Sequence, residues 1–338
     1  MRLIRKGRLQ QWIWLFAGTL LLVAILVLTI WRKVHLEMLN HHLLSAIKAN
    51  DTGVVIDLLE RGADANTHDE PPHKRSSWHM LLEELHLRRG SPSSPPSALR
   101  LALEWRPGPG SSIQPTIQDT PLIRALMNHG ARLNGPEIVA HMARTYAFCS
   151  AYQDTGTLSM NDSTQNLTFR TAFVRPDRFY FEFARKPKNR FVLWKSGIRV
   201  FSWTKSQHSV VETDLDMGIN GSAGASLGTS TTVPGMLFPE EMNGWVGLEP
   251  SSPDARLTGT KIIDGIACYE IVPSGKSVTA FYVDTRLFLL RKSIEAYPAT
   301  HDEAVTYYHP LVNVPISQNT FQVGLTDLVE SQCDFTGN

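Results

Sequence analysis

The spacing of hydrophobic and polar residues changes three times along this chain, and each change marks a different kind of structure. The first segment, from Trp12 to Trp31, carries no charged side chain. Twenty residues rise about 30 Å in an α-helix, which is about the thickness of the hydrocarbon layer of a membrane. Tryptophan stands at both ends of the segment, where indole rings favour the membrane interface. We therefore predict a transmembrane helix over residues 12–31, preceded by a cytoplasmic stub at residues 1–11.

Basic residues flank this predicted span unequally. Four precede it and two follow it closely: Arg2, Arg5, Lys6, Arg8, Arg32 and Lys33. This excess predicts a cytoplasmic N-terminus and places the rest of the chain outside the cytoplasm. A cleaved signal peptide is the alternative. The apolar run is longer than the usual h-region of about 7–15 residues and no A-x-A site follows it, which favours an uncleaved anchor in a single-pass protein of a bacterial envelope, its bulk periplasmic.

Helical periodicity follows the span in residues 39–67. Two sets of apolar residues each share one face of a helix: Leu43, Leu44, Ala46 and Ile47, then Val54, Val55, Leu58 and Leu59. Gly62 follows the second set, as a glycine does after the end of a helix. Two short helices followed by the Gly-Ala-Asp-Ala-Asn turn of residues 62–66 resemble an ankyrin repeat.

A second, interrupted copy of this pattern follows. Residues 97–105 favour a first helix and residues 119–134 a second helix with its turn, so Leu126, Gly130 and Ala131 take the roles of Leu59, Gly62 and Ala63. Two Pro/Ser-rich insertions separate the pieces, at residues 71–96, which hold a helical patch at Trp78–Leu87, and at residues 106–118. We predict an ankyrin-like module over residues 39–134. The resemblance implies a protein-binding surface; a spacer between membrane and C-terminal domain is the alternative.

The remaining chain, residues 135–330, begins as a helix and continues as strands. Asn134-Gly135-Pro136 opens the helix, with proline at its first position. Its apolar stripe is Ile138, Met142, Tyr146 and Cys149. The period then becomes two. Predicted strands include residues 179–183, 190–194, 198–203, 209–212, 256–263, 266–272, 277–283, 286–294 and 304–309. The Asp264-Gly265 pair predicts a tight hairpin, and Asp284-Thr285 a second one. One helix and about nine antiparallel strands predict an α+β fold with a curved sheet or open barrel.

This region also resembles a known family. The residues are Cys149, Tyr152, Asp154 and Gly156, in a C-x-x-Y-x-D-x-G pattern, followed by residues 173–183, 263–271 and 281–295. Together they are similar to the LolA-like half-barrels of the outer-membrane lipoprotein carriers, over about residues 136–325. The resemblance implies a sheet curled around an apolar cavity that holds acyl chains, with helices over the cavity mouth at residues 214–241. The Gly/Ser/Thr-rich composition there leaves two interpretations, a gate for a ligand and a disordered loop.

Composition removes several function classes. Lys+Arg number 33 against 32 for Asp+Glu, so a net charge of +1 gives no pull toward nucleic acid. Three cysteines exclude a four-cysteine zinc site within one chain, and the histidines lack metal-ligand spacing. No phosphate-binding loop or dinucleotide motif occurs. Residues 224–228 match the Gly-x-Ser-x-Gly nucleophile pattern but lack the preceding strand that its chemistry needs. We expect no catalytic residue, metal or cofactor.

The sequence therefore predicts a membrane-anchored extracytoplasmic binding protein. Its half-barrel would hold a lipid or the acyl chain of a lipoprotein, and its ankyrin-like module would contact a protein partner. The candidate cavity-lining residues are Phe179, Phe181, Phe183, Leu193 and Trp203. The alternative is an envelope sensor or scaffold that acts only through protein–protein contacts. An open apolar cavity would favour the first function and a core filled by side chains the second.

The cysteines leave a second choice open. An oxidising compartment would permit a disulfide between Cys149 and Cys268. Two buried thiols on apolar faces are the alternative, because free cysteine behaves as a small hydrophobic residue.

Overall fold

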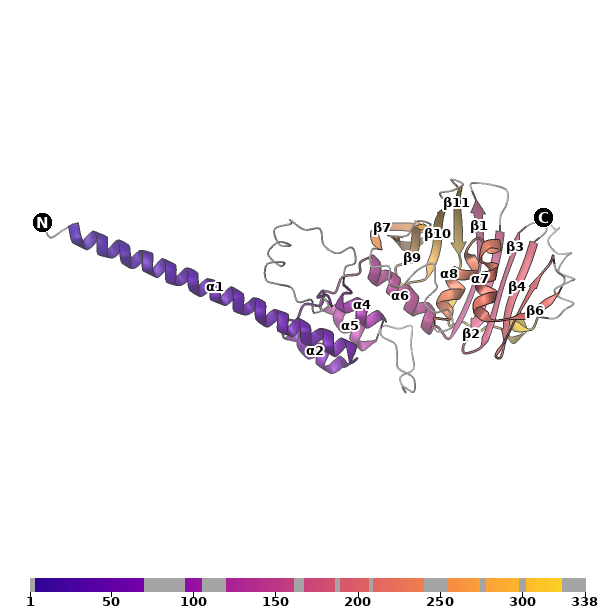
Figure 1. Ribbon diagram of the computed structural model, residues 1–338, viewed down its shortest axis with the longest axis horizontal. Coiled ribbons are helices and arrows are strands. Elements are labelled where there is room, and N and C mark those ends of the chain that lie inside the picture. The colour runs from indigo at the N-terminus through magenta and orange to yellow at the C-terminus, as the bar shows by residue number, and fades with distance from the viewer. Residues whose placement is uncertain are drawn as a thin grey trace. The chain divides into compact units, whose positions relative to one another are not determined.

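The computed structural model describes residues 4–69, 95–104, 120–160, 167–185, 189–206, 209–239, 255–273, 278–297 and 302–323. These fall into two compact units, each shown in Figure 1. The helical unit holds the described residues up to Arg132 except Pro95, and the sheet unit holds Pro95 and those from Leu133 onward. The predicted helical patch Trp78–Leu87 and the insertion at residues 106–118 lie outside the described ranges.

The first element, α1, is a single helix over Ile4–Lys48. Among the described residues, the part from Gly18 to Lys48 is long and apolar enough to cross a membrane, and its most apolar stretch is not buried by the rest of the chain. This confirms the predicted apolar helix, while its orientation and retention stay predictions. The first helix of the repeat module, expected as a separate element, is instead the end of α1. No glycine or proline stands between Trp31 and Lys48, so nothing interrupts the helix.

The described residues of the helical unit form three further short helices: α2 Thr52–Glu60, α4 Ala98–Glu104 and α5 Pro121–Asn128. The N–H of Val54 donates to the Asp51 side chain at 3.1 Å, which caps α2. The predicted apolar faces are buried, with Leu43, Val55 and Leu126 fully so. The predicted burial of Val54 with this face is wrong, because its side chain is 45% exposed.

A glycine turn follows the second helix of each pair, after α2 and after α5. Gly62 and Gly130 both have left-handed backbone angles, with φ of 95° and 86°, as the sequence pattern predicts. The side chain of Asn66 bridges the turns, since its Nδ2 donates to Gly130 O at 3.0 Å and its Oδ1 accepts from Arg132 N at 2.9 Å. The two copies therefore stack turn against turn.

The sheet unit is built on one antiparallel sheet. In the described residues its order is β6-β5-β4-β3-β2-β1-β11-β10-β9-β8-β7, with β12 beside β1. The strands are β1 Ala151–Met160, β2 Leu167–Val174, β3 Arg178–Arg185, β4 Asn189–Ser196, β5 Arg199–Thr204, β6 Val210–Thr213, β7 Arg256–Ile263, β8 Ile266–Val272, β9 Val278–Asp284, β10 Leu290–Tyr297, β11 Asp302–Tyr308 and β12 Leu311–Val312. The predicted meanders are confirmed. The pairing of β1 with β11, which joins them into one sheet, was not predicted.

Within the described ranges, three helices cover one face of this sheet: α6 Gly135–Phe148, α7 Leu215–Ser226 and α8 Thr229–Leu237. Figure 1 shows α7 and α8 lying across the strands. The predicted stripe of α6 is buried to the last residue, with 0% exposure at Ile138, Met142, Tyr146 and Cys149. We call this side of the sheet the helix-covered face.

The disordered-loop interpretation of residues 214–241 is wrong for residues 215–237, which form α7 and α8. Leu227 and Gly228 join the two helices with φ of 52° and 84°. Every side chain from Thr229 to Phe238 is buried. Burial against the sheet outweighs the weak helix propensity of glycine, serine and threonine.

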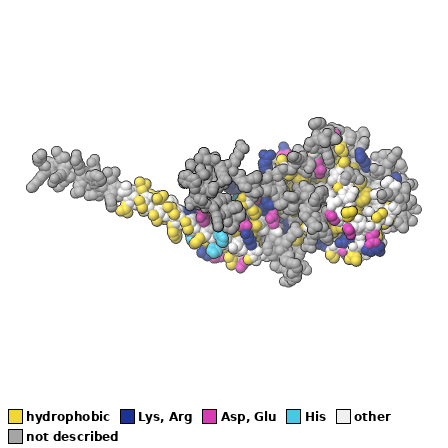
Figure 2. Space-filling model, viewed as in Figure 1, with side chains coloured by type: hydrophobic (Ala, Val, Ile, Leu, Met, Phe, Trp, Pro, Cys, Tyr) yellow, Lys and Arg dark blue, Asp and Glu magenta, His cyan; other side chains and the backbone are white. Residues whose placement is uncertain are grey.

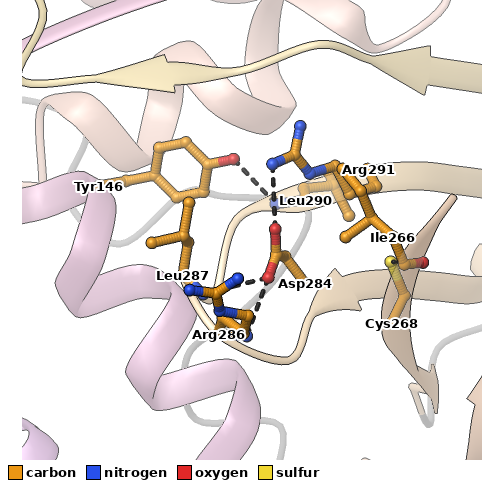
Figure 3. A network of polar contacts seen from close by, with 8 residues as sticks. All are labelled: Tyr146, Ile266, Cys268, Asp284, Arg286, Leu287, Leu290 and Arg291. Carbon is orange, nitrogen blue, oxygen red and sulfur yellow. Dashed lines mark hydrogen bonds and ion pairs between the residues drawn. The ribbon is translucent and has the colours of Figure 1, made fainter. Parts of the chain in front are cut away.

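One of the two predicted hairpins has the expected turn. Asp264 and Gly265 have φ of 49° and 79°, as in a type I′ turn. The second hairpin is wider than predicted, because β10 begins only at Leu290. The Oδ1 atom of Asp284 accepts the N–H groups of Arg286 and Leu287 at 2.8 and 3.1 Å, which folds the loop around this carboxylate (Figure 3). Arg291 pairs with its Oδ2 at 3.0 Å.

Candidate functional site

The predicted cavity-lining phenylalanines lie in a filled core. Phe179, Phe181 and Phe183 are exposed by 0, 0 and 2%, and Leu193 by 0%. All four belong to one cluster with buried residues of α6, α7 and α8. The ring of Phe238, just after α8, lies 5.1 Å from that of Phe179. In this structure, side chains of the helices occupy the space that a ligand of the sheet would need.

Trp203 does not share this face. In the β4–β5 register it stands opposite Val192, and it packs with Tyr180, Trp194 and Phe321 in a separate cluster. Trp203 therefore cannot line a cavity together with Phe181, which corrects that part of the candidate set. Alternation within a strand shows which residues share a face of that strand. It does not show which face of the sheet the set occupies, because that depends on the register with the neighbouring strand.

The two cysteines lie in different clusters. Cys149 packs in the core of the helix-covered face, whereas Cys268 packs with Ala280 and Tyr282 on the opposite face. Both are free thiols, so the structure contradicts the candidate disulfide. Burial raises the pKa of each thiol to about 11. Cys333 lies outside the described residues.

A buried carboxylate links β1 to the chain after β11. Asp154 is 1% exposed, and its Oδ2 accepts the hydroxyl of Tyr152 at 2.9 Å. Its Oδ1 accepts the N–H of His309 at 2.8 Å. Burial raises the pKa of Asp154 to about 7, although both hydrogen bonds oppose the shift. These contacts hold two segments far apart in sequence together.

The other residues of the C-x-x-Y-x-D-x-G pattern also have structural roles. The Sγ atom of Cys149 donates to Tyr146 O at 3.2 Å at the end of α6. A side chain at Gly156 would overlap the ring of Phe169 and the carbonyl oxygen of Tyr307, so only glycine fits there. The hydroxyl of Tyr146 accepts the N–H of Leu290 at 3.0 Å (Figure 3). The pattern residues, together with Tyr146, which precedes the pattern on α6, thus hold α6 and the two meanders around one core.

Arg175, in the turn between β2 and β3, binds the carboxyl ends of two helices. Its Nε donates to Cys149 O at 2.9 Å, and its guanidinium also donates to the carbonyl oxygens of Tyr146 and Ala147 at the end of α6. The same group donates to Leu237 O at the end of α8, at 3.2 Å. A cation at helix carboxyl termini is favoured by the helix dipole. Arg175 therefore holds the helical cover against the sheet.

The Gly-x-Ser-x-Gly match has no nucleophile geometry. Ser226 ends a helix instead of following a strand, and it is fully buried. Its hydroxyl contacts that of Ser230 at 3.0 Å. Within the described ranges, no group of three or more His, Cys, Asp and Glu side chains could hold a metal ion.

An open groove lies in the helical unit, between the C-terminal half of α1 and α2. It has a volume of about 560 Å³. Its lining is His35, Met38, Leu39, His42, Ser45, Ala46, Ala49, Asp51, Val54, Asp57, Leu58 and Arg61. Leu39 and Leu58 form a buried floor, while Met38 and Val54 are 54 and 45% exposed at its sides. Figure 2 shows hydrophobic side chains along the described part of α1 that leads to it.

Sequence reasoning missed this groove, although a signal was present. Met38 and Leu39 on α1 and Ala49 just after it are apolar residues outside the predicted set of Leu43, Leu44, Ala46 and Ile47, and all three line the groove. His42 also lines the groove, although the histidines were considered above only as metal ligands. The groove begins four residues after Trp31, at the end of the predicted span.

Comparisons with known proteins give fold likeness only. No protein-family profile matches the chain, and no curated protein matches it. The ankyrin-like pattern of the helical unit thus remains a resemblance.

Several solved structures resemble part of the chain. The MucA/MucB complex of Pseudomonas aeruginosa matches with a TM-score of 0.33 and 11% identity, covering 56% of this chain and 61% of the other. A LolA superfamily protein of Nitrosomonas europaea matches with a TM-score of 0.28 and 9% identity, covering 57% of this chain and 99% of the other. LprF of Mycobacterium bovis matches with a TM-score of 0.34 and 9% identity, covering 54% of this chain and 94% of the other. The match spans about three fifths of the MucB complex chain, and at these TM-scores no functional conclusion follows for this chain.

Proposed function

We propose that this chain is a membrane-anchored binding protein that acts outside the cytoplasm through protein–protein contacts, and that it catalyses no reaction. One contrast supports the proposal. The candidate ligand face of the sheet is filled, with Phe179 and Phe181 at 0% exposure, whereas the groove between α1 and α2 is open. A scaffold or sensor needs such an open surface on a rigid support.

The lining of the groove fits a helix of the partner. Ser45, Ala46 and Ala49 are small, so they permit close approach of a helix backbone along α1. Leu39 and Leu58 supply an apolar floor for the partner's apolar stripe. On its other side the same pair of helices already packs against α4 and α5 in this way. This stacking is the arrangement that the ankyrin-like pattern implies.

The position of the groove favours a partner at the membrane surface. The groove starts at His35, just after Trp31, Arg32 and Lys33. Because α1 is continuous from the apolar segment to Lys48, the groove is held close to the end of the span. The unequal flanking charges support an extracytoplasmic location.

Site-specific photo-crosslinking in cells tests the proposal. A photoreactive amino acid at Val54 of the full chain should give one protein adduct. Ser45→Trp, which fills the groove from an exposed position, should remove that adduct. His41→Trp is the matched control, because His41 is exposed on the same helix and lies outside the groove. An adduct that survives Ser45→Trp, or the absence of any protein adduct, would contradict the proposal.

A second candidate function is the binding of an acyl chain under α7 and α8. It is favoured by the aromatic face beneath a cover of weak helix formers, including Gly218 and Gly221 in α7. Labelling the full chain with a photoreactive fatty acid tests it. Adducts on β3 or α8 would support the acyl-chain function, and adducts confined to α1 would reject it.

A further inference from the structure

Among the described residues, strand β7 has a neighbouring strand on one side only and forms an edge of the sheet. Among the described strands it pairs only with β8 and ends the strand order. Side chains on both faces of β7 are exposed, among them Thr258, Thr260, Lys261 and Ile262. The opposite edge is protected differently. Strand β6 has four residues, and Glu212 on it is bound by two nitrogens of Arg199, at 3.0 and 2.6 Å.

The hairpin geometry shows which backbone groups of β7 are open. A two-residue turn is closed by a hydrogen-bonded pair, here Ile263 and Ile266. The next pair, Ile262 and Ala267, therefore turns its N–H and C=O groups away from the ladder. The structure agrees, because Ala267 O accepts from Thr285 N at 3.0 Å on the β9 side. By the same alternation, Thr260 and Ile262 direct their N–H and C=O groups to the open edge.

The side chains of β7 differ between its two faces. Leu257 and Ile262, which are 38 and 67% exposed, share the side of the helix-covered core, since Leu257 stands opposite Ile271. Arg256 and Lys261 are exposed on the other side, where Lys261 stands opposite Cys268. The strand contains no acidic residue. The first face also carries Thr260, which stands opposite Tyr269, and the second face also carries Glu270 of β8, which stands opposite Gly259. The charged side chains that β7 itself contributes are both positive, and both lie on the second face.

We propose that β7 binds an extended peptide segment of a protein partner as an added strand, with apolar residues beside Leu257 and Ile262 and acidic residues beside Arg256 and Lys261. The open N–H and C=O groups select an extended backbone, and the two faces select an alternating apolar and acidic sequence. A second copy of the chain fits poorly. Antiparallel pairing of two β7 strands would place Arg256 and Lys261 of both copies on the same face of the joined sheet, where like charges repel. This site is independent of the groove in the helical unit.

Peptide binding to the full chain in detergent micelles tests the proposal. The probe is a fluorescein-labelled nonapeptide of alternating valine and glutamate, and its control alternates valine and lysine. Fluorescence anisotropy should report saturable binding of the first peptide only. Thr260→Pro removes an outward N–H without removing a bond to β8 and should weaken binding at least about tenfold. Thr260→Val keeps the N–H and should leave binding unchanged.

A second measurement uses only wild-type protein, so it does not depend on whether the Thr260→Pro variant folds. The valine/glutamate peptide with N-methyl groups on alternate amides keeps its charge but cannot pair with the edge. Wild-type protein should not bind it. Equal binding of the methylated peptide, or of the valine/lysine peptide, would overturn the proposal. A dimer of the full chain that Thr260→Pro abolishes would also overturn it and assign the edge to a second copy.

Discussion

Tyr152 donates its hydroxyl hydrogen to Oδ2 of Asp154 across 2.9 Å, and both side chains are buried in the core of the sheet unit. The two residues stand two apart on β1, so they project from the same side of the strand. Through His309 N the same carboxylate also binds the chain that follows β11. A charged group at this position is costly, and burial accordingly raises the pKa of Asp154 to about 7.

This carboxylate should make stability depend on pH. The folded-state pKa of about 7 exceeds the ordinary value of 3.8, so the folded chain holds the proton more tightly than the unfolded chain. Protonated Asp154 therefore adds to the free energy of unfolding. Its contribution is full below about pH 4 and is lost as pH rises through 7, and it amounts to roughly 4 kcal/mol at most. Asp154→Asn should remove this decline of the free energy of unfolding with rising pH. Urea unfolding followed by tryptophan fluorescence at several pH values measures it. Asp216→Asn, at an exposed site, should leave the decline in place.

Gly156 should tolerate no side chain. Gly156→Ala would push its methyl group into the Phe169 ring and the Tyr307 carbonyl, and the carbonyl belongs to a paired strand that cannot move alone. We expect a loss of about 1–3 kcal/mol in the free energy of unfolding. Gly259→Ala is the control, since a Cβ there meets no atom within 4 Å. Equal stability of the two variants would contradict the packing of β1 against β2.

Arg175→Lys should loosen the helical cover of the sheet. A lysine carries the charge but not the planar fork that reaches Cys149 O and Leu237 O together. The expected loss is about 1.5–3 kcal/mol, the range for hydrogen bonds to a charged group. Hydrogen exchange should show faster exchange in α6 and α8. Arg199→Lys, which alters an exposed pair with Glu212, should leave these helices unchanged.

The two described cysteines should react as free, buried thiols. Burial raises the pKa of Cys149 and Cys268 to about 11, so in the folded protein both should react slowly with a thiol reagent near neutral pH. In denaturant without reductant, three thiols per chain should react, including Cys333 of the sequence. A count of one would establish a disulfide and contradict the separate clusters seen here.

The local sequence pattern was sufficient to predict the structure of a segment wherever the adjacent residues decide that structure. The α6 stripe, the alternation of Phe179, Phe181 and Phe183, and the Asp264-Gly265 turn were all predicted, because helix period, strand period and backbone angles are properties of a few adjacent residues. The apolar helix near the N-terminus follows from length and composition alone.

Tertiary structure decided the features that depend on distant partners. Helices α7 and α8 form from a glycine-rich sequence because the sheet buries them. Trp203 falls on the face opposite Phe181 because strand register, which no single segment encodes, sets the face. The groove beside α1 likewise exists only where two elements meet, and β7 is an edge only because no other described strand pairs with its second side. Burial, register and edges are relations between segments, and only the assembled fold fixes them.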